Sequence, residues 1–217
     1  MVNKRLQLGV FASGRGSNFT KIVEAVETGR LAADIRLLVT NNPTAGALDT
    51  ATARGIETAV LRRNECSSRS FFVEQMAGIL ENAGVDFVAL AGYMRKIPPE
   101  IVRSYENRML NIHPALLPHF GGKGMYGTRV HRAVLEAGCK VSGVTVHLVD
   151  AVYDRGPIVA QRCVPVKPGD TVERLAARVL KEEHILYPQV LRHFARGEVW
   201  ISGKMAEVVP ESARQEN

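Results

Sequence analysis

Two side chains that can donate hydrogen bonds to a reacting group stand two residues apart in the middle of the chain. Asn111 and His113 belong to the run NIHP, which ends a predicted strand, and Asp154 lies in the later turn YDRGP. Alternate residues of a strand point to the same side of a sheet, so the amide and the imidazole can meet one ligand. The same letters also fit a turn-forming asparagine, a surface histidine and a common turn-forming aspartate. These residues alone therefore leave catalysis and a plain turn open.

A second candidate is the glycine-rich loop from Gly14 to Asn18, which separates a predicted strand from a predicted helix. Free backbone N–H groups and the helix dipole favour an anion such as phosphate at this place. Phe19 stands where a dinucleotide fingerprint needs glycine or alanine, and Gly124 follows Lys123 where a Walker loop needs serine or threonine. A plain tight turn with Asn18 as the helix cap remains the alternative.

Other catalytic classes lack their signatures. The sequence contains no H-E-x-x-H, C-x-x-C or G-x-S-x-G pattern, which argues against a metal site and a serine-hydrolase elbow. Three cysteines fit a reducing compartment, and the N-terminus has no apolar run long enough for a signal peptide or a membrane span, so we expect a cytoplasmic protein. A net charge of +6 favours anionic partners in general without selecting one.

Strand and helix patterns alternate along the chain. Strands are expected at 6–10, 34–40, 85–91, 109–112, 144–149 and 158–166. Helices are expected at 19–26, 45–54, after Ser67 as the cap, after Pro98, at 128–137 and from Asp170 as the cap towards Phe194. This order predicts an α/β fold with one doubly wound, mostly parallel sheet flanked by helices, in which ligands bind at the carboxyl ends of the strands. We expect one domain over residues 1–217, with residues 1–4 and 211–217 frayed.

Five ordered segments resemble the folate-dependent formyltransferases, a family with a Rossmann-like single α/β domain of this size. They are ASGRGSNF at 12–19, LAGYMRKIP at 90–98, NIHPALLP at 111–118, GVTVHLVDAVYDRGPIVAQ at 143–161 and ARVLKEEHILYP at 177–188. The resemblance implies transfer of the formyl group of 10-formyltetrahydrofolate, a co-substrate, to the amine of glycinamide ribonucleotide in purine synthesis. It implies no metal, nucleic acid or membrane partner, and a monomer or homodimer.

The resemblance also implies a role for individual residues. The catalytic residues would be Asn111, His113 and Asp154; the substrate site would include Gly16, Ser17, Asn18 and Glu183; the folate site would include Arg69, Met94, Arg95, Lys96, Ile97 and Asn111. The segment 120–131 is longer and richer in glycine than in the shorter enzymes of the family, so no site residue is assigned there.

The implied chemistry fits these side chains. Attack of an amine on a formyl carbon produces an oxyanion, which the Asn111 amide and the His113 imidazolium can stabilise. An ionised Asp154 would raise the pKa of His113 and guide proton transfer. The rivals within the family, formyltetrahydrofolate hydrolase and methionyl-tRNA formyltransferase, carry an extra domain for which we expect no room here. A rival from another class is a noncatalytic nucleotide- or RNA-binding protein.

Overall fold

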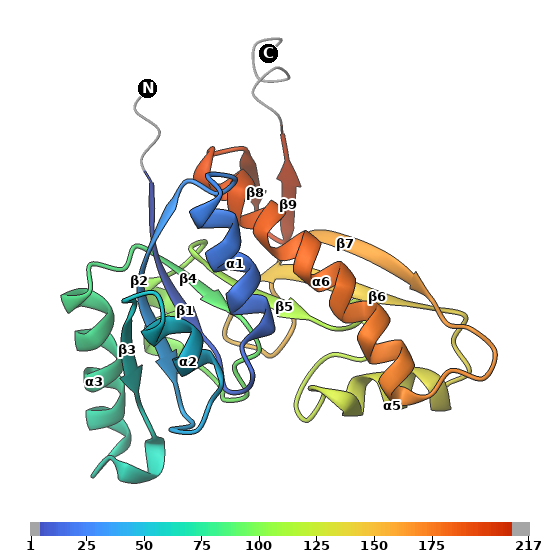
Figure 1. Ribbon diagram of the computed structural model, residues 1–217, viewed down its shortest axis with the longest axis horizontal. Helices are drawn as coiled ribbons and strands as arrows, with labels where there is room; N and C mark the ends of the chain where they lie inside the picture. The colour runs from blue at the N-terminus through green and yellow to red at the C-terminus, as the bar shows by residue number, and fades with distance from the viewer. Residues whose placement is uncertain (1–4, 210–217) are drawn as a thin grey trace. The chain divides into compact units, whose positions relative to one another are not determined.

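The computed structural model describes residues 5–209 (Figure 1). The terminal segments expected to fray, 1–4 and 211–217, lie outside the described residues. The chain divides into two compact units, Met1–Asn111 and Ile112–Asn217. The expectation of a single domain stays a prediction, and the two units are described separately below.

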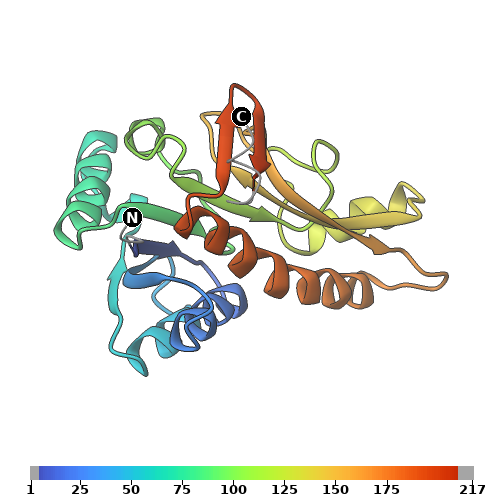
Figure 2. The ribbon, with the colours of Figure 1, turned by 90° about the horizontal axis from the view of Figure 1, so that it is seen from above.

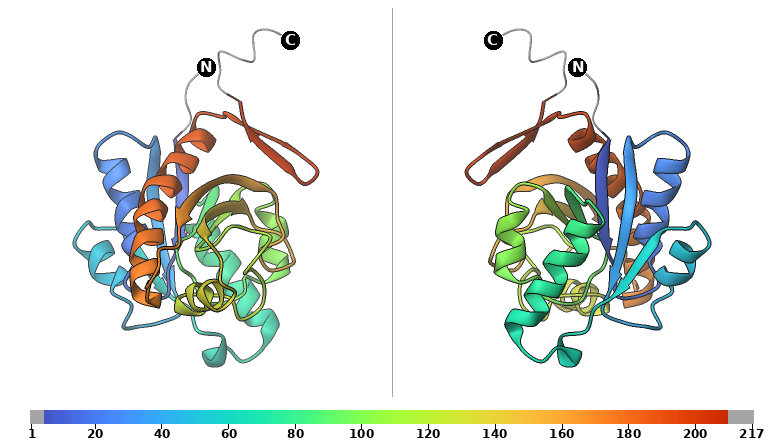
Figure 3. Two further views of the ribbon diagram at one scale, coloured as in Figure 1. Left: turned by 90° about the vertical axis from the view of Figure 1, so that its right-hand side faces the viewer. Right: turned by 90° about the vertical axis from the view of Figure 1, so that its left-hand side faces the viewer.

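The first unit is a parallel sheet covered by helices. Its strands are β1 (Leu6–Phe11), β2 (Ala33–Thr40), β3 (Glu57–Val60), β4 (Phe87–Leu90) and β5 (Met109–His113). The last two residues of β5 belong to the second unit. The helices of the first unit are α1 (Ser17–Glu27), α2 (Ala47–Thr52), the 3₁₀ helix η1 (Arg63–Glu65), α3 (Arg69–Asn82) and α4 (Pro99–Ser104). The strands run parallel in the order β3-β2-β1-β4-β5. Helices α1 and α2 lie on one face of this sheet and α3 and α4 on the other (Figure 3).

Apolar runs explain the centre of this sheet. All four residues of β4 are buried, as are Leu8, Val10 and Phe11 of β1. A strand covered by helices on both faces needs an almost continuous apolar sequence, which these two segments supply. The carboxyl ends of β1, β2 and β4 are thereby fixed, and the loops that follow them start from a rigid base.

The second unit contains α5 (Thr128–Glu136), β6 (Val141–Leu148), β7 (Ile158–Pro165), α6 (Val172–Ala195), β8 (Val199–Ser202) and β9 (Met205–Val208). Strands β6 and β7 are antiparallel, β9 runs parallel to β7, and β8 pairs antiparallel with β9. Helix α6 packs against β6, β7 and α5, and it runs alongside both strands in Figure 2. Its buried face includes Leu175, Val179, Tyr187 and Leu191.

Within the described residues the strands make a nine-stranded sheet in the order β3-β2-β1-β4-β5-β6-β7-β9-β8. The sheet is mostly parallel and is flanked by helices, which confirms the predicted α/β class. In the part of the chain that the structure describes, no helix is both long enough and apolar enough to cross a bilayer.

Two helix caps differ from the sequence prediction. Ser68, rather than Ser67, accepts a backbone N–H of α3. Thr171, rather than Asp170, accepts a backbone N–H of α6. Asp170 instead forms two hydrogen bonds to the guanidinium of Arg178, eight residues further along the chain. Neighbouring Ser, Thr and Asp residues are all good caps, so the sequence could not choose between them.

Three short strands were not predicted. β3, β8 and β9 have four residues each, and their side chains are exposed or half-buried. They lie at the two ends of the strand order, where few apolar side chains are buried. Such short segments carry too little of the alternating pattern to be recognised from sequence.

Candidate active site

His113 is the last residue of β5, and both of its ring nitrogens face acceptor groups. The side chain is only 4% exposed. Its Nε2 atom lies 2.8 Å from the backbone carbonyl oxygen of Phe120, and because a carbonyl can only accept, Nε2 carries a proton and donates it. Its Nδ1 atom lies 3.7 Å from Oδ2 of Asp154. The nitrogen that can change its protonation is therefore Nδ1, and it faces a carboxylate.

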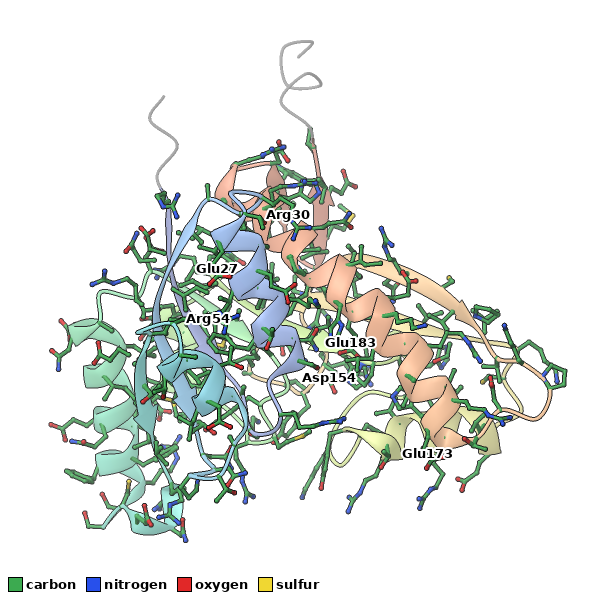
Figure 4. The ribbon with its side chains drawn as sticks, in the orientation of Figure 1. Glu27, Arg30, Arg54, Asp154, Glu173 and Glu183 are labelled. Carbon is green, nitrogen blue, oxygen red and sulfur yellow. The ribbon has the colours of Figure 1, made fainter. Side chains whose placement is uncertain are left out.

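Asp154 lies in the turn between β6 and β7, where it adopts a left-handed conformation with φ 53°. Its Oδ2 atom accepts the backbone N–H of Gly122 at 2.7 Å. The turn needs glycine at position 156, because a Cβ there would lie 1.9 Å from the carbonyl oxygen of Leu148. These constraints fix the carboxylate, which is only 10% exposed, beside the imidazole. Figure 4 labels Asp154 together with Glu183 of α6.

His147, which sequence reasoning missed, lies on the other side of the Asp154 carboxylate. Its Nε2 atom is 3.6 Å from Oδ1 of Asp154, and its Nδ1 atom donates to the carbonyl oxygen of Leu148 at 2.8 Å. The side chain is 2% exposed and lies within the buried strand β6. A histidine inside the apolar run VTVHLV was the available signal, because a buried polar side chain needs partners.

The environment of this cluster shifts the pKa of both members of the pair. Burial acts to raise the pKa of Asp154, but the contact with His147, the charge of His113 and the Gly122 N–H together hold that pKa below its ordinary value. Burial lowers the pKa of His113, and this effect outweighs the Asp154 carboxylate and the Phe120 carbonyl, which both act to raise it. Asp154 thus acts in the expected direction, but the expected net rise in the pKa of His113 is wrong because desolvation of the imidazole is larger.

The backbone that follows His113 is held by polar side chains of the same unit. Oγ1 of Thr145 accepts the backbone N–H of Leu117 at 3.0 Å and donates to the carbonyl oxygen of Ala115 at 2.7 Å. Nε2 of Gln161 donates to the carbonyl oxygen of Leu117 at 3.0 Å. These bonds tie the segment after β5 to β6 and β7, so the position of His113 is set by two further strands.

A third buried histidine, on α5, is close enough to interact with His113. His131 is 5% exposed, and within the described residues its Nδ1 atom has no hydrogen-bond partner. Burial, with a smaller contribution from His113, lowers the pKa of His131 to about 4. His131 is therefore neutral at pH 7 and adds no charge beside the catalytic candidates.

In the first unit, Gly16, Ser17 and Asn18 form the start of α1. Gly16 is the N-cap and adopts a left-handed conformation with φ 75°. A Cβ there would lie 2.6 Å from Cβ of Ala47, so this position needs glycine for the fold as well as for any ligand. Asn18 is a buried residue inside the helix and not its cap, which excludes the alternative interpretation of the loop as a turn capped by Asn18.

The residues expected at the folate site also belong to the first unit. Arg69, the first residue of α3, forms a bidentate ion pair with Glu100 of α4, with distances of 2.9 and 2.8 Å. Met94 is 47% exposed and Ile97 is buried. Arg95 and Lys96 are exposed, and Asn111 is half-buried in β5, where it pairs with Leu90. In the second unit, Glu183, expected at the substrate ribose, is 9% exposed on α6.

The structure therefore groups the predicted residues within each unit. It brings His113 and Asp154 together and adds His147 to them. It places Gly16 to Asn18 at one helix N-terminus and Met94 to Ile97 in one segment after β4. In residues 5–209 we find no cluster of His, Cys, Asp and Glu side chains arranged to hold a metal ion.

Comparison with known proteins gives one consistent family. The model of the formyl transferase family matches residues 6–191. The chain is 48% identical over 189 residues to a protein of Arabidopsis thaliana named phosphoribosylglycinamide formyltransferase, chloroplastic, and 47% identical over 188 residues to one of the same name from Vigna unguiculata. Each match covers 87% of this chain but 65% and 60% of the plant proteins, so the chain spans less than two thirds of their length.

Solved structures point to the same family as the sequence matches. The crystal structure of glycinamide ribonucleotide transformylase 1 from Symbiobacterium toebii shares 38% identity and a TM-score of 0.90, covering 97% of this chain and 96% of that chain. A formyltetrahydrofolate deformylase from Pseudomonas syringae has a TM-score of 0.85 at 21% identity, covering 95% of this chain and 67% of that chain, which shows a shared fold alone. The family match over residues 6–191 and the 38% identity with the solved transformylase over 97% of the chain establish that this chain belongs to the formyl transferase family.

Proposed function

We propose that this chain is a phosphoribosylglycinamide formyltransferase, which transfers the formyl group of 10-formyltetrahydrofolate to the amine of glycinamide ribonucleotide in purine biosynthesis. The relatives named for this reaction and the family match support it. The observation that carries it is the enclosed pair of His113 and Asp154, because an imidazole held beside a carboxylate suits the proton transfers that amine formylation needs.

In the proposed reaction His113 begins as the neutral imidazole. Burial lowers its pKa, so Nδ1 is free of a proton at neutral pH and can accept one. As the amine nitrogen forms its bond to the formyl carbon, the C=O electron pair moves to oxygen and the amine gives up a proton to Nδ1. The imidazolium that results then has acceptors at both nitrogens, Asp154 and the Phe120 carbonyl, which favour the charge at this stage.

The second half of the reaction returns that proton. When the oxyanion collapses, the bond between the formyl carbon and the donor nitrogen breaks, and His113 supplies the proton that this nitrogen needs. The products are the formylated amine and tetrahydrofolate, so no covalent enzyme intermediate is required. We assign the Asn111 amide as a hydrogen-bond donor to the oxyanion, the positive charge of the His113 imidazolium as its second stabilising group, and the Asp154 carboxylate as the group that supports His113 and guides the proton.

Binding roles follow the same proposal. The backbone at Gly16, Ser17 and Asn18 would hold the substrate phosphate at the positive end of α1, and Glu183 would meet the ribose. Met94, Arg95, Lys96, Ile97 and Asn111 would line the folate site together with Arg69. The guanidinium of Arg69 fits a folate carboxylate, since it already holds the Glu100 carboxylate with two bonds.

The proposal includes a protein without a bound metal, nucleic acid or membrane partner, acting as a monomer or homodimer. The compartment also belongs to the proposal. We infer the cytoplasm from the three cysteines, which are free, although two plant relatives are named as chloroplastic.

The test is formyl transfer by the purified protein and its dependence on one histidine. The release of folate product is followed by absorbance with 10-formyltetrahydrofolate and glycinamide ribonucleotide. His113→Gln should lose about 10²- to 10⁴-fold in kcat, as removal of a proton-transfer group does. His119→Gln is the matched control, since His119 is exposed and close in sequence. A wild-type protein that binds the ribonucleotide but transfers no formyl group would favour the noncatalytic binding protein instead.

A further inference from the structure

Every polar group of Ser13 takes part in a hydrogen bond within the first unit. Its backbone N–H donates to the carbonyl oxygen of Gly92 at 3.2 Å, and its own carbonyl oxygen accepts from Nδ2 of Asn42 at 3.2 Å. Its hydroxyl donates to Oδ1 of Asn41 at 2.5 Å and accepts the backbone N–H of Met94 at 2.8 Å. These four bonds reach two other segments of the unit, and Ser13 is half-buried.

These bonds join three loops that leave the sheet at the same edge. Ser13 follows β1 and directly precedes the glycine-rich loop, Asn41 follows β2, and Met94 follows β4. The strands β2, β1 and β4 are neighbours and parallel, so their carboxyl ends lie together. Through its hydroxyl, Ser13 links the loop after β1 to the loop after β2 and to the loop after β4.

Apolar contacts reinforce one of these links. The rings of Phe11 and Tyr93 meet edge to face with their centroids 5.2 Å apart. Phe11 is fully buried, and its carbonyl oxygen accepts the backbone N–H of Ala91 at 2.8 Å. The backbone of residues 91–94 is thereby aligned with that of residues 11–13 by three successive hydrogen bonds, of which the last runs through the Ser13 side chain.

We propose that Ser13 is a positioning residue that couples the glycine-rich loop at Gly14–Asn18 to the segment Met94–Ile97, so that a ligand ordering one of them prepares the other. The inference rests on the proposed function, which assigns the phosphate to the loop and the folate to the segment. The Ser13 hydroxyl itself touches neither ligand in this proposal. Its effect is a coupling free energy between two binding events, and such coupling is reciprocal.

The coupling has a physical origin in conformational entropy. A ligand that fixes the loop backbone also fixes Ser13, and through the Met94 N–H it restricts the start of the folate segment. The second ligand then orders less of the chain and binds more tightly. A serine with only a local structural role would stabilise the fold without making one ligand change the affinity of the other.

The experiment measures the affinity for 5,8-dideazafolate, which carries no formyl group and cannot react, by calorimetry with and without saturating glycinamide ribonucleotide. In the wild-type protein the ribonucleotide should lower the Kd at least about fivefold, a typical coupling. In Ser13→Ala the ratio of the Kd without the ribonucleotide to the Kd with it should fall to less than about twofold. Exchange of the Met94 amide hydrogen should become faster in that variant.

Thr44→Ala is the matched control. Thr44 also donates a side-chain hydroxyl within this region, to Oδ1 of Asn42 at 2.9 Å, but its bond stays inside one turn. It should retain the wild-type ratio. Asn41→Ala provides a second variant, which removes the acceptor that orients the Ser13 hydroxyl and should give an intermediate ratio.

The outcomes separate the two proposals. If the wild-type protein binds both ligands with no coupling, or if Ser13→Ala and Asn41→Ala keep the wild-type ratio, the coupling role of Ser13 is wrong and the proposed function stands. If Ser13→Ala does not fold, the ratio in Asn41→Ala decides. If the wild-type protein binds neither ligand, the proposed function fails and the inference fails with it.

Discussion

The Nδ1 atom of His113 lies 3.7 Å from Oδ2 of Asp154, and both side chains are almost completely enclosed by protein. The other nitrogen of the same ring donates to the Phe120 carbonyl oxygen. An imidazole in this arrangement is neutral at rest because it is buried, yet it has two acceptors ready for the charged form. This combination suits a group that receives a proton during the reaction and then returns it.

Replacement of Asp154 by asparagine should separate its charge from its structural role. Asparagine tolerates the left-handed conformation found at position 154, and its Oδ1 can still accept the Gly122 N–H. We expect Asp154→Asn to fold and to bind both substrates while kcat falls about 10²- to 10⁴-fold. Steady-state kinetics with a thermal melt of the variant check this, and near-normal kcat would remove Asp154 from the mechanism.

A charge introduced at Ser17 should test the phosphate loop without disturbing its fold. Gly16 itself is unsuitable, because any side chain there would collide with Ala47. Ser17 is half-buried in the first turn of α1, where an acidic side chain interacts favourably with the helix dipole. Ser17→Asp should raise KM for the ribonucleotide at least about tenfold by repelling its phosphate.

Two comparisons control the Ser17 experiment. Ser17→Ala removes the hydroxyl without adding charge and should change the same KM much less. The affinity of Ser17→Asp for the folate analogue alone should stay near the wild-type value. An unchanged KM for the ribonucleotide in Ser17→Asp would show that the phosphate does not bind at this loop. A parallel loss of affinity for both ligands would show a folding defect or a misplaced site.

Glu100 should compete with the folate tail for Arg69. The two residues form a bidentate ion pair on the surface, and the hydrogen bonds between them lower the pKa of Glu100 and raise that of Arg69. Exposed pairs of this kind are weak, so Glu100→Ala should lower KM for 10-formyltetrahydrofolate by only about two- to fivefold. The donor analogue that lacks the glutamate should show no change. An equal change for both donors would mean that Arg69 does not meet the carboxylates.

His131 should make the stability of the protein depend on pH in the acidic range. Burial lowers its pKa from 6.5 to about 4, so the unfolded chain takes up a proton that the folded chain resists. Its contribution to stability is complete above pH 6.5 and is lost as the pH falls towards 4, by at most about 3 kcal/mol. Urea unfolding of the wild type and of His131→Leu at pH 7 and pH 4.5 should show a smaller acid loss in the variant. An equal loss in both proteins would contradict the buried neutral state of His131.

The sequence predicted the sheet and most of its helices because the central strands are apolar runs and the helices end at glycines. It could not choose the caps between Ser67 and Ser68 or between Asp170 and Thr171, since the side chains of Ser, Thr and Asp can all accept an N–H at the start of a helix. The pairing of His113 with Asp154 followed from family resemblance, because their contact depends on the turn before β7. His147 was missed because its contact with Asp154 depends on how the turn after β6 folds, and its own segment looked like a simple strand.

The most direct test of the account compares transfer with hydrolysis. The purified protein is given 10-formyltetrahydrofolate with and without glycinamide ribonucleotide, and formylated ribonucleotide, tetrahydrofolate and free formate are quantified over time. Rapid consumption of the donor is expected only with the ribonucleotide present, with formylated product equal in amount to tetrahydrofolate. Formate released at a comparable rate without the ribonucleotide would contradict it and assign the His113 and Asp154 pair to a hydrolase.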